Sequence, residues 1–125
     1  MSATQNSIPD SNQIYFKQLL SGRDFAADDQ LAQQMVNFVY LIGDKSTREC
    51  MIIDPAYAVE ELLSVAEQDG MKVVGALATH YHPDHVGGSM MGANIDGIAT
   101  LLSKVDIPIH VQELEAQWVM RTTGV

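Results

Sequence analysis

Residues 79–88 read T-H-Y-H-P-D-H-V-G-G, and the rest of the chain is best interpreted outward from them. Three of the chain's four histidines and one aspartate fall within six consecutive positions, directly after an apolar run. Imidazole nitrogen and carboxylate oxygen are donors that Zn²⁺ and similar cations prefer. An extended segment would project His80 and His82 to the same side. This stretch therefore predicts a metal site at the end of a strand.

The residues before this segment predict a strand, a helix and a second strand. Residues 49–54 form an apolar run, and the apolar positions of residues 59–66 recur with the spacing of an amphipathic helix that Gly70 would cap. Residues 73–78 (VVGALA) lack polar alternation, which predicts a strand covered on both faces. Open α/β sheets place their sites at the carboxyl ends of such strands.

Other elements are predicted from local pattern. Residues 35–42 and 49–54 are expected to form an antiparallel hairpin, because both are rich in strand-forming residues and the loop between them is polar. The remaining expectations are a strand at 14–20, a connection with a helical turn at 21–34, an irregular stretch at 90–97, helices at 98–105 and 113–120, and a strand at 107–111.

The segment at 79–88 resembles the T-H-x-H-x-D-H signature of the metallo-β-lactamase superfamily, which includes glyoxalase II, lactonases, persulfide dioxygenases and a ribonuclease branch. The resemblance implies the α/β (α+β) class and an αββα sandwich. The chain is similar to the first half of that fold with part of the second. We therefore expect the fold in residues 13–125, after a polar, flexible leader at residues 1–12.

The resemblance also implies which residues bind metal. His80 and His82 would bind a first ion, and Asp84 and His85 a second. The cofactor would be one or two Zn²⁺ ions, with Fe or Mn²⁺ as alternatives, because all three accept these donors. Asp84 would also be catalytic, by orienting a water molecule or moving its proton.

Two further residues would support the ligands without binding the metal. Asp54, at the end of the run IIDP, matches an aspartate that accepts an imidazole N–H in the family, although an aspartate before Pro55 is also favoured at a helix start. Thr79 would support the site through its hydroxyl group or simply end a strand. His110, in IPIHVQE, lacks the proline-glycine turn that precedes the family's third metal histidine, so we expect an ordinary strand residue there.

The activity implied by the resemblance is hydrolysis of a thioester or ester-type carbonyl by a metal-bound hydroxide, as in glyoxalase II. An iron-dependent persulfide dioxygenase-like protein is one alternative. The other is a catalytically incomplete half-domain acting as an interaction module, because three further family ligands have no counterpart before Val125. Such a half-domain would pair with a second copy or with a missing carboxyl-terminal half.

Charge and composition restrict the partners. A formal net charge of −9 opposes nucleic-acid binding, so a small-molecule substrate is expected. The apolar runs are shorter than the ~20 residues of a membrane-spanning helix, so no membrane partner is expected. The single cysteine, Cys50, cannot form an internal disulfide and is expected to be buried in a cytoplasmic protein.

Overall fold

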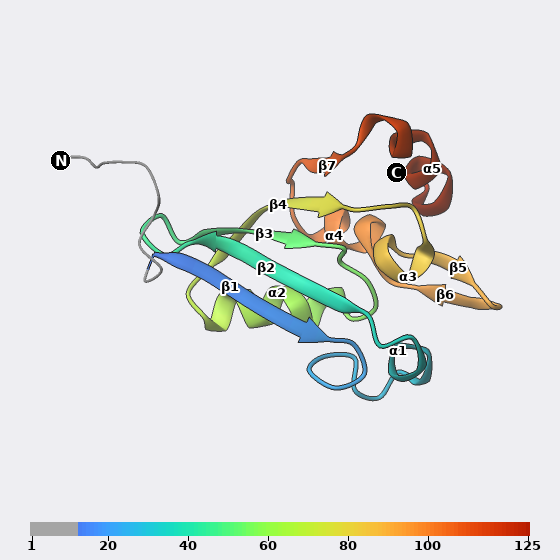
Figure 1. The fold of residues 1–125 in the computed structure, drawn as a ribbon, viewed down its shortest axis with the longest axis horizontal. Coiled ribbons are helices and arrows are strands. Elements are labelled where there is room, and N and C mark those ends of the chain that lie inside the picture. Colours follow the sequence, from blue (N-terminus) through green and yellow to red (C-terminus); the bar gives the residue numbers. More distant parts are fainter. Residues whose placement is uncertain (1–12) are drawn as a thin grey trace.

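The computed structural model describes residues 13–125, and the leader expected at residues 1–12 lies outside the described residues. Figure 1 shows the arrangement of the elements. In chain order these are β1 (Ile14–Leu20), α1 (Gln30–Met35), β2 (Phe38–Asp44), β3 (Glu49–Ile53), α2 (Val59–Gln68), β4 (Lys72–Ala78), α3 (Pro83–Val86), β5 (Gly88–Met90), β6 (Ala93–Ile95), α4 (Ile98–Lys104), β7 (Ile109–Val111) and α5 (Glu113–Thr123).

Five strands form one mixed sheet in the order β1-β2-β3-β4-β7. The predicted β2–β3 hairpin is confirmed, and β1 adds to it antiparallel. Strands β3, β4 and β7 run parallel, with α2 and α4 in the connections between them. The carboxyl ends of β3 and β4 therefore meet at one edge of the sheet, where the segment at 79–88 begins.

The hydrophobic core lies between the sheet and helices α2 and α4, which cover one face (Figure 1). Leu41 of β2 and Ile52 of β3 are paired in register, and neither is accessible to solvent. Leu62 of α2 and Leu101 of α4 are also fully buried in the same cluster. The predicted helical stripe at residues 59–66 is confirmed, because it is this stripe that packs on the sheet.

The opposite face of the sheet is not covered by any other part of residues 13–125 and is called the open sheet face below (Figure 1). Its exposed apolar members include Phe16, Phe38, Ile42 and Leu77, which are 36–58% accessible, and the Tyr40 ring packs against both phenylalanines. The prediction that residues 73–78 are covered on both faces is therefore wrong for this part of the chain. The run is apolar on both sides, yet only one side is buried.

Two other predictions are also wrong, one about an irregular segment and one about the start of a strand. Residues 90–97 are not irregular, because β5 and β6 form a hairpin. Its two-residue turn has positive φ at Met91 (50°) and Gly92 (78°), the conformation of a type I′ turn, and methionine gives no sequence signal for it. The strand expected at 35–42 starts late because α1 extends to Met35 and ends at Val36, whose φ is 47°.

No helix in the described part of the chain is both long and apolar enough to cross a membrane.

One stability prediction arises at the edge of the sheet. The buried Tyr15 hydroxyl donates to Asp69 Oδ2 at 2.6 Å, and hydrogen bonds from Lys17 and then Tyr15 lower the pKa of Asp69. We expect Tyr15→Phe to lower the free energy of unfolding by about 1 kcal/mol at pH 7. Because the pKa of Asp69 is lowered, its carboxylate stays ionised in the folded protein below the ordinary aspartate value, and the loss should shrink only as pH falls through this lowered pKa. Urea unfolding of both proteins along a series from pH 7 down to about pH 2 measures this, and a loss that stays constant across the series would contradict it.

Candidate metal centre

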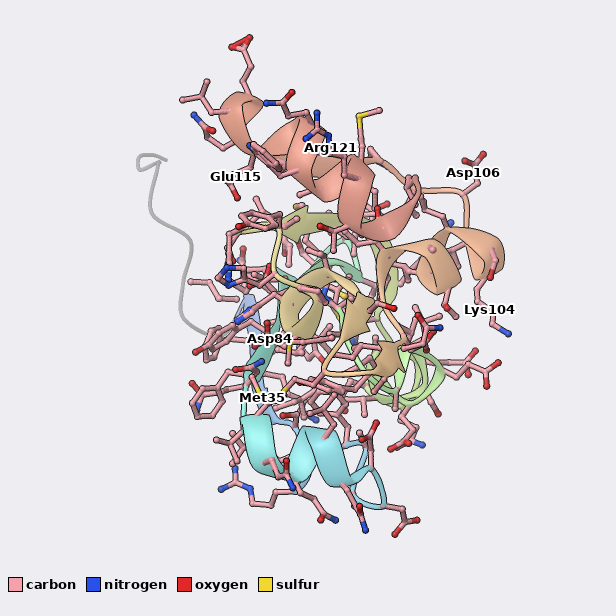
Figure 2. All side chains as sticks on the ribbon, turned by 90° about the vertical axis from the view of Figure 1, so that its right-hand side faces the viewer. Met35, Asp84, Lys104, Asp106, Glu115 and Arg121 are labelled. Atoms are coloured by element: carbon pink, nitrogen blue, oxygen red, sulfur yellow. The ribbon has the colours of Figure 1, made fainter. Side chains whose placement is uncertain are left out.

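The ends of β3 and β4 bring together two segments that are distant in sequence. Asp54 directly follows β3, and its backbone N–H donates to Leu77 O of β4 at 2.9 Å. Thr79 directly follows β4, and the next residues lead into α3, which begins at Pro83 in the first helical turn. Figure 2 views this end of the molecule, with Asp84 between α5, which carries Glu115, and α1, which ends at Met35.

Asp54 is the buried centre of this arrangement. Its Oδ1 accepts a hydrogen bond from the Thr79 backbone N–H at 2.7 Å, and its Oδ2 accepts one from the Thr79 hydroxyl at 2.6 Å. Oδ2 also lies 3.1 Å from His85 Nδ1. The φ of Asp54 is 55°, in a left-handed region that costs energy for a residue with a side chain. Three contacts thus hold this carboxylate in one position despite the backbone strain.

These contacts determine which histidine nitrogens remain free. The single Thr79 hydroxyl proton is donated to the Asp54 carboxylate, which only accepts when ionised. The Thr79 oxygen must then accept the hydrogen of His80 Nδ1, 2.9 Å away. His85 likewise donates its Nδ1 hydrogen to Asp54. In the neutral form of each imidazole the free lone pair is therefore on Nε2, and this is the form that binds a metal ion.

The three histidines of the motif lie side by side. The His80 ring centroid is 4.6 Å from that of His82 and 4.2 Å from that of His85. Donor atoms of Asp54, His80 and His85 lie within 4.8 Å of one another and could hold a metal ion. Of the four ligands predicted from sequence, His80 and His85 are in this group. His82 adjoins it through His80, whereas Asp84 adjoins it through His85.

Asp84 is buried and held by a residue that the sequence did not indicate. Its Oδ2 accepts a hydrogen bond from Asn37 Nδ2 at 2.6 Å and lies 3.6 Å from His85 Nε2. Asn37 also donates to the Asp84 backbone oxygen at 3.1 Å, while its own N–H donates to the hydroxyl of buried Ser21. Asn37 precedes Asp84 by 47 residues, so no local spacing pattern could have connected them.

Burial and charge shift the histidine pKa values in opposite directions. The hydrogen bond to Asp54 raises the pKa of His85, the negative charges of Asp54 and Asp84 add to this, and burial opposes it. Burial lowers the pKa of His80, and the neighbouring His85 and His82 lower it further. His80 is therefore neutral at pH 7 and ready to bind metal, whereas a metal at His85 competes with a proton more strongly.

Tyr57 carries the one buried side-chain polar atom in the described residues that lacks a hydrogen-bond partner. Burial raises the pKa of this phenol to about 12, the negative charge of Asp84 contributes, and the nearby Asn37 side chain opposes the shift without reaching hydrogen-bonding geometry. We expect Tyr57→Phe to leave the free energy of unfolding unchanged or to raise it by up to about 1 kcal/mol, because it removes an unpaired hydroxyl. Thermal and urea unfolding check this. A loss above about 1 kcal/mol would contradict it.

Two other residues follow the sequence expectations. His110 is exposed on β7, where it pairs in register with Leu77, and it does not belong to the group around Asp54. Cys50 is 1% accessible, and burial raises the pKa of its thiol. Thr79 does more than end a strand, because its hydroxyl connects Asp54 to His80.

The site residues lie within the range matched by a known family. A family model described as the metallo-beta-lactamase superfamily matches residues 33–125, which is most of the chain. The chain belongs to this superfamily. The α/β fold class predicted from the segment at 79–88 is therefore confirmed.

Curated relatives agree with the glyoxalase II-like resemblance. The chain is 40% identical over 60 residues to a hydroxyacylglutathione hydrolase of Rhodospirillum rubrum, covering 48% of this chain and 23% of that protein. It is 36% identical over 83 residues to a protein of the same name from Gloeobacter violaceus, covering 63% of this chain and 32% of the relative. The chain thus spans about a quarter to a third of these relatives.

Solved structures show the same fold. A metallo-beta-lactamase from Staphylococcus aureus superposes with a TM-score of 0.59 at 29% identity, covering 83% of this chain and 25% of that one. ETHE1 from Myxococcus xanthus superposes with a TM-score of 0.54 at 23% identity, covering 76% and 34% of the two chains. The second likeness concerns the fold alone.

Proposed function

We propose that this chain is the metal-binding part of a hydrolase that cleaves a thioester or ester-type carbonyl, similar to glyoxalase II. The observation that carries the proposal is the group of Asp54, His80 and His85 at the carboxyl ends of β3 and β4. The similarity to two hydroxyacylglutathione hydrolases supports the thioester class of substrate. A small anionic substrate is compatible with the negative chain, because a bound dication reverses the local field.

The donor chemistry of the site fits a divalent metal. His80, His82, Asp84 and His85 remain the proposed ligands, with Zn²⁺ as the proposed ion and one or two ions per site. A divalent ion there would lower the pKa of a water molecule and polarise the carbonyl group of a substrate. Asp54 would either join the ligands or, as the sequence predicts, support the site by hydrogen bonds with His85 and Thr79 without binding the metal.

Asp84 is proposed to orient the attacking water or accept its proton. Asn37 Nδ2 donates a hydrogen bond to Asp84 Oδ2 at 2.6 Å, whereas Asp84 Oδ1 has no hydrogen-bond partner in the described residues. The buried carboxylate therefore has one oxygen that is fixed by the protein and one that is available to a ligand or a water molecule. Asn37 would hold the carboxyl group in the orientation that presents Oδ1.

The experiment that tests this proposal combines elemental analysis with a thioester-hydrolysis assay. We expect the purified 125-residue chain to retain Zn²⁺ at a defined stoichiometry. A longer product of the same reading frame that contains the remaining family ligands should hydrolyse a glutathione thioester. A longer product that binds metal but cleaves no thioester or ester would contradict the hydrolase proposal. Iron together with persulfide-dependent oxygen consumption would favour the dioxygenase-like alternative.

A second candidate function is that of a non-catalytic interaction module, which the open sheet face favours. Exposed aromatic and aliphatic side chains lie on this face in β1, β2 and β4, and the rings of β1 and β2 pack against one another. Such a surface is expected to bind another sheet or a second copy of the chain. Gel filtration distinguishes the two candidates: a stable monomer that holds two metal ions per chain would contradict the interaction module. A cytoplasmic location remains proposed from the single buried thiol.

A further inference from the structure

Helix α5 contacts the loop of residues 79–82, which joins β4 to α3, at Tyr81, the residue between His80 and His82. The backbone N–H of Tyr81 donates to Glu115 Oε1 at 3.1 Å. The Tyr81 ring lies 5.8 Å from the Trp118 ring and 4.9 Å from the His82 ring. One helix side chain thus holds the loop backbone, and another holds the ring that packs against His82.

The part of α5 that makes these contacts is itself well anchored. Its first turn is capped by the Gln112 side chain, which accepts from the Leu114 N–H at 2.7 Å. Val119 is buried in a cluster with Ala78 at the end of β4, Val86 of α3 and Ile98 of α4. Glu115 and Trp118 are three residues apart and lie on the same side of the helix. A helix fixed in this way can restrain the loop, because its own position is set by the core.

His82 depends on this contact more than His80 and His85 do. Asp54 and Thr79 hold the other two imidazoles by hydrogen bonds, as described above. His82 has no such bond in the described residues, and its ring lies against the rings of His80 and Tyr81. Fixing the backbone of a free loop residue costs roughly 1–2 kcal/mol. A loop that is already ordered before the metal binds avoids this cost, so its affinity for the metal is higher.

We propose that Glu115 and Trp118 are positioning residues, which hold His80 and His82 in place for the metal through Tyr81. The inference rests on the proposed metal site but adds residues outside the family motif. Glu115 acts as a hydrogen-bond acceptor and not through its charge. Glutamine should therefore replace it, because the amide oxygen can accept the same N–H.

The test measures Co²⁺ affinity and the visible spectrum of the Co²⁺ complex in four versions of the 125-residue chain: wild type, Glu115→Ala, Glu115→Gln and Glu113→Ala. Glu113→Ala is the matched control, because Glu113 is exposed in the same first turn of α5 and its replacement removes the same charge. Glu115→Ala should weaken binding roughly tenfold and alter the spectrum. Glu115→Gln and Glu113→Ala should stay within about twofold of wild type, because both leave an acceptor facing Tyr81.

Hydrogen exchange of the Tyr81 amide in metal-free protein gives an independent readout. It should accelerate in Glu115→Ala and remain slow in Glu115→Gln and Glu113→Ala. Equal affinities and equal exchange rates in Glu115→Ala and Glu113→Ala would overturn the positioning role. If the wild-type chain binds no Co²⁺, the proposed metal site fails, while the exchange rates still decide whether Glu115 holds the loop. Weaker Co²⁺ binding in Glu115→Gln than in Glu113→Ala would overturn the acceptor argument.

The single tryptophan of the chain provides a second variant and a direct signal. Trp118 fluorescence should be quenched by Co²⁺ in wild type, because the indole is two ring contacts from His82. Trp118→Phe keeps an aromatic partner for Tyr81 and should keep Co²⁺ affinity within about threefold, whereas Trp118→Ala should weaken it by more. Equal affinities of these two variants would overturn the role of the ring.

Discussion

Replacing His80 by alanine is expected to reduce the Zn²⁺ affinity of the chain by roughly a hundredfold or more. Loss of a residue that merely supports a metal ligand already costs 10–100-fold, and His80 is placed to be a ligand itself. Its ring lies against both His82 and His85, and its Nε2 is free because Nδ1 is hydrogen-bonded to Thr79. Isothermal titration calorimetry at pH 7 measures the effect.

His110→Ala is the matched control for this experiment. It removes the same side chain from an exposed position on β7, outside the group around Asp54. The Zn²⁺ affinity of this variant should equal that of the wild-type chain. If His110→Ala weakened binding as much as His80→Ala, the metal would be bound elsewhere and the assignment of the site would be wrong. Circular dichroism of both variants confirms that they are folded.

Replacing Leu41 by alanine is expected to have the largest effect on stability. Leu41 lies on β2, on the face of the sheet that the helices cover, and its side chain is inaccessible to solvent in the hydrophobic core. Replacing a fully buried leucine by alanine lowers the free energy of unfolding by roughly 2–5 kcal/mol, which is about a third of the total stability of many domains. Urea unfolding monitored by circular dichroism measures the change.

Ile42→Ala is the control, because the next residue along β2 lies on the open sheet face and is 39% accessible. Truncation there leaves no enclosed cavity, so it should cost less than about 1 kcal/mol. A cost for Ile42→Ala as large as that for Leu41→Ala would mean that the open sheet face is buried in solution, for example against a second copy. The two variants therefore also report on whether this face is covered.

Sequence patterns predicted the parts of the molecule that depend on local spacing. The helical repeat at residues 59–66 and the paired apolar runs around residues 43–48 became α2 and the β2–β3 hairpin. The family resemblance also implied supporting roles for Asp54 and Thr79. Each follows a strand directly, so the neighbouring strand ends bring them into contact.

The remaining features depend on distances through space that no spacing pattern records. Asn37 reaches Asp84 across 47 residues, and Glu115 reaches Tyr81 across 34. Asn37 appeared only as one residue within a strand-forming run, and Glu115 as an ordinary acidic residue in the first turn of a helix. The open sheet face was also hidden, because an apolar strand has the same composition whether its second face is covered or not.

The proposed metal centre depends on which nitrogen of each imidazole ring carries the proton, and NMR measures this. Long-range ¹H–¹⁵N spectra of the histidine rings report which nitrogen carries the proton and which binds a metal. We expect His80 and His85 to be protonated at Nδ1, and their Nε2 signals to shift when Zn²⁺ is added, while those of His110 do not. Unchanged His80 and His85 signals at saturating Zn²⁺, or a shift confined to His110, would contradict the proposed metal centre.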